Sequence, residues 1–69
     1  MTFEDAKEFV MPFGKHAGRT LDAIAADDDG LRYLDWLYGE RGDGGFQVDH
    51  ALKAYLEDPS VQKELEDLL

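Results

Sequence analysis

The sequence predicts an α+β fold, in which a short β-hairpin packs on a cluster of four to five short helices. The hairpin is indicated by Gly14 and Gly18, which bracket a short loop between two extended runs. Helices are indicated by apolar residues that recur at helical spacing over about 29–38, 47–58 and 59–68. A chain of 69 residues forms one domain, 1–69, with a small core.

The first elements are an opening helix and the hairpin, expected over about 10–21. Thr2 followed by Asp5 has the form of a capping box, which predicts a short helix at the start of the chain. Pro12 excludes helix around itself and favours an extended arm before it. Thr20 can cap a brief helical turn after the returning arm. Since an isolated two-stranded ribbon is marginal in water, the hairpin must lie on the helices.

The central helix, about 29–38, follows three consecutive aspartates, 27–29, whose charges favour a helix N-terminus. This helix is apolar around most of its circumference, so we expect it to be contacted on several sides. Trp36 is accordingly expected in the core, against Phe13 and Leu21 of the hairpin, because the two halves must meet to form one core.

The C-terminal half contains a loop and two amphipathic helices. Gly39 is placed to end the central helix, and three glycines between residues 40 and 45 predict a loop. Asp58 and Pro59 mark the start of the last helix. That helix carries an apolar stripe, and a small core offers few side chains to cover it, so weak self-association through the stripe is expected. The stripe consists of Val61, Leu65, Leu68 and Leu69.

Charge is distributed unevenly and gives a first functional hypothesis. The net charge is −9, yet no acidic residue occurs between Val10 and Thr20. This segment can form a phosphate-contacting tip for DNA or RNA, since glycine lets the backbone approach a ligand closely. The candidate residues of this tip are Lys15, His16, Arg19, Gly14 and Gly18.

Two other interpretations of the charges stay open. In one, the chain is an acidic protein-interaction or inhibitor protein that binds a basic partner, which suits the net charge better. The candidate residues for that surface are Asp28, Asp29, Glu64 and Asp67. In the other, Lys15 and Arg19 only neutralise nearby carboxylates, and the glycines serve the turn alone.

The sequence contains none of the catalytic patterns that we sought. A calcium loop beginning at Asp27 would place Leu31 and Tyr38 where oxygen ligands are required. The two histidines stand in no zinc motif, there is no cysteine, and Ser60 is better explained as a helix cap. We therefore expect no catalytic residue, no metal, no cofactor and no enzymatic activity. Without an apolar run long enough to span a membrane, or a signal peptide, a cytoplasmic protein is expected.

The run FVMPFGKHAGRTL, followed by LRYLDWL, resembles a family of small domains described as putative quorum-sensing-regulated virulence factors. It is also similar to the C-terminal module of exodeoxyribonuclease X-like exonucleases. The matching positions are Met11, Pro12, Phe13, Gly14, Lys15, His16, Gly18, Leu21, Tyr33, Leu34, Trp36 and Leu37. The resemblance implies a non-catalytic accessory module of bacterial or phage nucleic-acid metabolism, partnered by nucleic acid or a nucleic-acid-processing protein. Ala17 stands where family members commonly carry Lys or Arg, which weakens the cationic loop.

Overall fold

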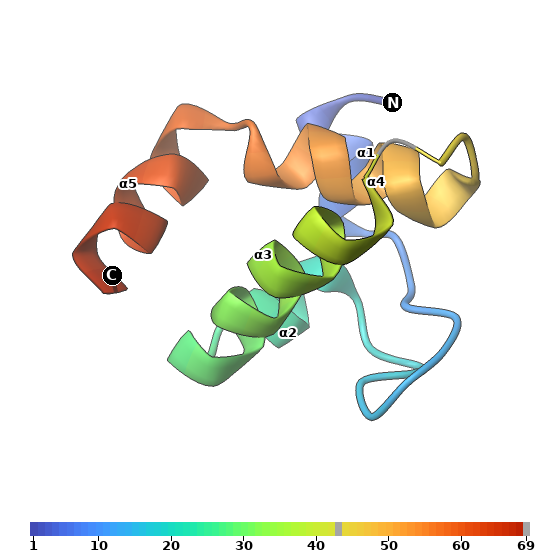
Figure 1. The fold of residues 1–69 in the computed structure, drawn as a ribbon, viewed down its shortest axis with the longest axis horizontal. Coiled ribbons are helices and arrows are strands. Elements are labelled where there is room, and N and C mark those ends of the chain that lie inside the picture. Colours follow the sequence, from blue (N-terminus) through green and yellow to red (C-terminus); the bar gives the residue numbers. More distant parts are fainter. Residues whose placement is uncertain (43, 69) are drawn as a thin grey trace.

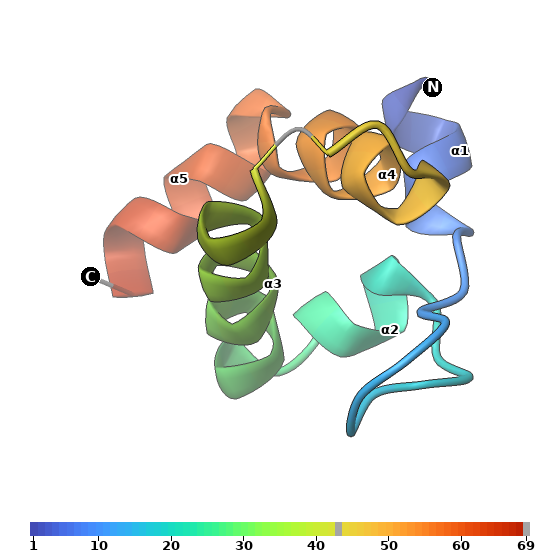
Figure 2. The same cartoon turned by 45° about the vertical axis from the view of Figure 1, so that its right-hand side comes forward.

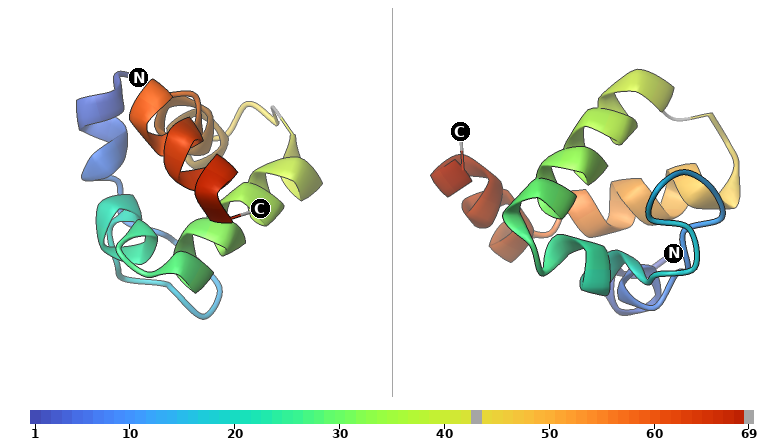
Figure 3. Two further views of the ribbon diagram at one scale, coloured as in Figure 1. Left: turned by 90° about the vertical axis from the view of Figure 1, so that its left-hand side faces the viewer. Right: turned by 90° about the horizontal axis from the view of Figure 1, so that it is seen from below.

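The computed structural model describes residues 1–42 and 44–68, which form five helices and no sheet (Figure 1). The helices are α1 (Phe3–Lys7), α2 (Leu21–Ala25), α3 (Asp28–Arg41), α4 (Gln47–Leu56) and α5 (Pro59–Leu68). α1 packs on α4 and α2 packs on α3, while α5 contacts both α3 and α4 (Figures 2 and 3). The resulting body measures 28 × 23 × 22 Å. No helix in the two described ranges is long and apolar enough to cross a membrane.

The predicted α+β class is wrong, because no β-hairpin forms over residues 10–21. A single isolated antiparallel bridge joins Val10 to Thr20, and the amide of Met11 donates to the carbonyl of Arg19 at 2.8 Å. The pairing does not extend into a ladder because the amide of Gly18 donates to the carbonyl of Met11 at 2.9 Å and the amide of Arg19 donates to the carbonyl of His16 at 3.2 Å. Beyond the proline the chain coils into turns, so the segment between α1 and α2 is a loop.

The helices expected from periodicity are present, with some ends shifted. α3 continues past its predicted end at residue 38, because Gly42, with a φ of +64°, ends it rather than Gly39. α4 ends at Leu56, before its predicted end at residue 58, and α5 has its predicted bounds. Thr2 and Thr20 cap α1 and α2, each accepting a backbone hydrogen bond of 3.1 Å at its hydroxyl.

The core lies between the helices, and each helix contributes one apolar face. Its members are Ala6, Met11, Leu21, Ile24, Leu31, Leu34, Leu37, Val48, Ala51, Leu52, Tyr55, Leu56, Val61 and Leu65. Val61 and Leu65 of α5 are therefore buried within one chain, and Leu68 packs against the same core. The stripe that suggested self-association is thus largely covered already; its fourth member, Leu69, lies outside the described residues.

The expectation that Trp36 lies in the core is wrong, since 57% of this residue is exposed. The buried residues of α3 are Gly30, Leu31, Leu34 and Leu37, and the three leucines recur three residues apart. Trp36 lies to one side of this stripe on the helical wheel, so α3 turns it away from the core. Three leucines fill the space that a tryptophan was expected to occupy.

A partly buried ion pair joins the end of α3 to the start of α4. Arg41 Nε donates to Asp49 Oδ1 at 2.6 Å, and the amide of Phe46 donates to Asp49 Oδ2 at 3.2 Å. The guanidinium lies 5.1 Å from the centre of the Phe13 ring. The hydrogen bond from Arg41 lowers the pKa of Asp49, although burial of the carboxylate acts in the opposite direction. The carboxylate thus caps α4 and fixes the preceding loop.

This ion pair is expected to make stability depend on pH in the acid range. The pKa of Asp49 is lowered by folding, so its contribution is present above the unfolded pKa of about 3.8 and disappears as the pH falls through the folded value. Asp49→Asn should lower the melting temperature at neutral pH, and its difference from the parent should shrink in acid. Circular dichroism melts over this pH range measure the effect.

Asp35→Asn, at an exposed position of α3, is the matched control and should melt in parallel with the parent at every pH. If the melting curves of Asp49→Asn also stay parallel to those of the parent from neutral pH into acid, the ion pair does not carry the predicted pH dependence.

Candidate functional site

The loop between α1 and α2 extends away from the helices (blue to cyan, Figure 1). Gly14 and Gly18 both adopt positive φ, +80° and +87°. A Cβ atom on Gly14 would also lie 2.8 Å from the hydroxyl of Tyr33, so glycine is needed there for two reasons. The amide of Gly18 donates to the carbonyl of Met11 at 2.9 Å, so it is not free to contact a phosphate in this conformation.

The three basic side chains of the loop lie close together, and two of them contact α3. Lys15 Nζ is 5.6 Å from the centre of the Tyr33 ring, and the His16 ring is 4.9 Å from the same ring. Arg19 Nη2 donates to the carbonyl of Ala23 at 3.1 Å, and its Nη1 lies 3.5 Å from His16 Nδ1. Lys15 and Arg19 remain exposed, so both charges are available to a ligand.

Neither exposed cation of the loop is neutralised by a carboxylate within the described residues. The ion pairs found there join Lys7 to Glu4, Arg32 to Asp29 and Arg41 to Asp49. Lys15 and Arg19 belong to none of these pairs. The arrangement therefore does not support the interpretation in which these two residues only balance neighbouring acids.

Two aromatic residues of α3 continue the loop's surface. The Tyr33 ring lies beside both Lys15 and His16, and the Trp36 ring is 6.0 Å from the Tyr33 ring with a tilt of 34°. Tyr33 is half-buried, whereas Trp36 is exposed. We call this group the loop–α3 surface; it consists of Lys15, His16, Arg19, Tyr33 and Trp36.

Sequence reasoning assigned Trp36 to the core and named neither ring as a site residue. The signal was present in the helical wheel. Leu31, Leu34 and Leu37 define one face, and neither Tyr33 nor Trp36 falls on it. A helix with more apolar residues than one face can hold leaves some of them for another surface.

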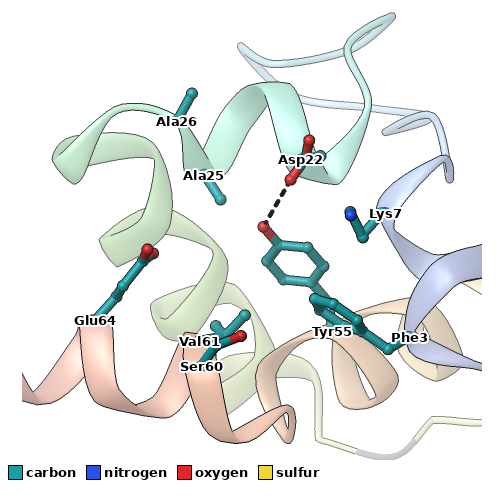
Figure 4. Close-up of a pocket in the computed structure, with 9 residues that line it drawn as sticks. All are labelled: Phe3, Lys7, Asp22, Ala25, Ala26, Tyr55, Ser60, Val61 and Glu64. Carbon is teal, nitrogen blue, oxygen red and sulfur yellow. Dashed lines mark hydrogen bonds between the residues drawn. The ribbon is translucent and has the colours of Figure 1, made fainter.

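A second surface contains most of the predicted acidic residues. Two adjoining hollows, of about 350 and 330 Å³, share Ala25, Ala26 and Glu64. The first lies among α1, α2, α4 and α5 and includes Lys7, and the second lies between α2, α5 and the start of α3. Figure 4 shows the first hollow, where Asp22 of α2 and Glu64 of α5 stand on opposite sides. We call the pair of hollows the acidic groove; its carboxylates are Asp22, Asp28, Glu64 and Asp67.

Three of the four acidic residues predicted for protein binding therefore lie together, and Asp29 lies apart. Asp29 is exposed and stands 4.0 Å from Arg32 on its own helix. At the floor of the groove, the Tyr55 hydroxyl donates to Asp22 Oδ1 at 3.4 Å (Figure 4). Burial, reinforced by the charge of Asp22, raises the pKa of Tyr55 to about 12, so this hydroxyl stays protonated.

Within the described residues, no group of three or more His, Cys, Asp or Glu side chains is placed to hold a metal ion. The four carboxylates of the acidic groove thus line a surface rather than converge on one point.

Comparisons of this chain with protein-family models, with curated proteins and with solved structures find no match. Function must accordingly be argued from the two surfaces themselves.

Proposed function

We propose that this chain is a non-catalytic accessory module of bacterial or phage nucleic-acid metabolism, which binds DNA or RNA weakly through the loop–α3 surface. The observation that carries the proposal is that Lys15 and Arg19 lie exposed and unpaired with any described carboxylate, and that Lys15 lies against the Tyr33 ring, next to Trp36. Phosphate oxygens are the usual ligands of such cations in nucleic-acid complexes. The resemblance of the loop sequence to nucleic-acid-associated modules supports the same proposal.

The proposed affinity is weak because few charges are available. Lys15 and Arg19 offer about two phosphate contacts, which correspond to a slope of log K against log salt of about −1.4 for a single strand and about −1.8 for a duplex. The molecule as a whole carries a net charge of −9, so its surface away from the loop repels the phosphate backbone. Binding is therefore expected at low salt and should be lost as salt increases.

The test is the double variant Lys15→Glu, Arg19→Glu, assayed with labelled oligonucleotides at low salt. We expect this variant to lose binding while keeping its fold, because both side chains are exposed. Fluorescence anisotropy gives the affinity and its salt dependence, and circular dichroism checks the fold.

The matched control is Lys53→Glu, Lys63→Glu, which makes the same change in net charge at exposed positions on α4 and α5. This control should retain most of the parent's affinity if the contacts are local to the loop. Equal losses in the two variants would show that overall charge governs binding. A parent protein that binds neither DNA nor RNA at low salt would defeat the proposal.

The acidic groove favours a second candidate function, that of an acidic protein-interaction or inhibitor protein. The fold brings Asp28, Glu64 and Asp67 around a floor that includes Leu31 and Leu68. A hollow with apolar lining and several carboxylates suits a Lys- or Arg-rich segment of a partner.

A cytoplasmic location is part of both proposals and is supported by the lack of cysteine.

The two candidates differ in the residues they need. If the groove is the binding surface, Glu64→Lys combined with Asp67→Lys should abolish capture of a Lys- and Arg-rich peptide, and Lys15→Glu with Arg19→Glu should not. The reverse dependence, measured with oligonucleotides, is expected for the loop–α3 surface.

A further inference from the structure

The Trp36 ring is an exposed aromatic surface that lies next to Tyr33, the ring that Lys15 contacts. Exposed aromatic rings occur at Trp36, 57% exposed, and at Phe46, 67% exposed. The cation nearest to Phe46 is Arg41, 6.0 Å from the ring, and Arg41 is already bound to Asp49. Trp36 instead continues the series of contacts that begins at Lys15 and passes through Tyr33. Of these two rings, Trp36 is thus the one connected, through Tyr33, to a cation that no described carboxylate neutralises.

The two aromatic rings of this surface are placed for different tasks. Tyr33 is half-buried beneath the loop, where the Gly14 backbone and the His16 ring lie against it. Trp36 lies farther from the loop and keeps more than half of its surface open. A flat ring that the protein itself does not cover can accept another flat ring, and nucleic-acid bases stack on tryptophan in this way.

From this placement we propose that Trp36 is a base-stacking residue, and that the loop–α3 surface takes single-stranded rather than duplex nucleic acid. The inference rests on the proposed function. Lys15 and Arg19 contact phosphates of the strand, and an unpaired base lies on Trp36. This division of roles is typical of proteins that combine a cationic track with stacking aromatics.

The acidic residues around Trp36 discriminate against a duplex. Asp29, Tyr33, Trp36 and Glu40 occupy positions i, i+4, i+7 and i+11 of α3, which share one helix face. Both acids are exposed and would repel phosphates that approached the ring. A single strand can turn a base toward the ring and keep its phosphates on the loop side. In a duplex the bases are already stacked, and extruding one costs free energy.

The chain's own fluorescence supplies a direct test, because Trp36 is its single tryptophan. The probes are oligo(dT) and oligo(U) of about 12 nucleotides, together with a DNA duplex of matched length. At low salt we expect both single strands to quench the tryptophan emission and to bind more tightly than the duplex. The two single-stranded probes also report whether DNA or RNA is preferred.

Two variants separate stacking from phosphate contact. Trp36→Ala should weaken single-strand binding about 5- to 150-fold, as measured by anisotropy, with little change in the salt slope. Trp36→Phe should recover part of the lost affinity, since a smaller ring still stacks. In contrast, the Lys15→Glu, Arg19→Glu variant should lose both affinity and salt dependence.

The outcomes also separate this inference from the proposed function. The inference is overturned if the duplex binds as tightly as the single strands, or if Trp36→Ala binds the single strands as tightly as the parent does. In either case nucleic-acid binding itself still stands. Absence of binding by all three probes at low salt defeats the proposed function and this inference together.

Discussion

Gly30→Ala is expected to leave most of the protein unfolded at room temperature. Gly30 is buried in the first turns of α3, where this helix crosses α2. A Cβ atom there would lie 1.9 Å from the carbonyl oxygen of Ile24 and 2.8 Å from its carbonyl carbon. Because a backbone group cannot rotate away as a side chain can, the two helices would have to separate. We expect a cost of about 3 kcal/mol or more, close to the whole stability of a domain this small.

Gly39→Ala is the matched control, since it makes the same substitution on the same helix. Gly39 is exposed, and nothing lies within 4 Å of the position of its Cβ atom. This variant should gain about 0.5–1 kcal/mol from the lower conformational entropy of alanine in the unfolded chain. Urea unfolding followed by circular dichroism measures both variants. A Gly30→Ala protein as stable as the parent would show that α2 and α3 do not pack as closely as described.

Leu34→Ala should be the most damaging of the ordinary truncations on α3. Leu34 has no exposed surface and faces the core, so its removal leaves a cavity and is expected to cost about 2–5 kcal/mol. Trp36→Ala, two residues away, removes a larger side chain but should cost about 1 kcal/mol or less, because that ring is exposed and its contact with Tyr33 is its main packing.

The test is which of the two variants, Leu34→Ala or Trp36→Ala, has the lower free energy of unfolding. Unfolding must be followed by circular dichroism, because Trp36→Ala removes the tryptophan signal. If the tryptophan variant proved the less stable of the two, Trp36 would have to be a core residue. Its role as a stacking surface would then be lost as well.

The positions of the helices could be predicted from the sequence because they depend on local signals. Thr2 and Thr20 satisfy helix amides at the predicted caps, and the apolar spacing after Pro59 gives α5 its predicted bounds. Strand pairing depends instead on hydrogen bonds between distant residues. Gly14 and Gly18 predict that the chain reverses direction, and the reversal does occur. They do not indicate whether the two arms form a β-ladder or a single bridge.

The site could be predicted only in part, for a related reason. The loop cations were identified from the charge pattern, but whether they meet acids depends on the tertiary arrangement. Trp36 was placed in the core because large aromatics are usually buried in small domains. The orientation of α3 instead leaves Trp36 exposed. The close approach of Gly30 to the carbonyl of Ile24 helps to set that orientation, and Ile24 lies on a different helix. No single-residue propensity contains this information.

The loop between α1 and α2 is held at two places on α3. Phe13 lies against the guanidinium of Arg41 at the end of α3, and the next residues, Gly14, Lys15 and His16, lie against Tyr33 of the same helix. The backbone of this segment is therefore ordered when the protein folds, and that entropy need not be lost again when a ligand arrives. Association should then resemble the docking of a preformed surface, in which ligand affinity depends on direct contacts with the loop rather than on its conformational adjustment.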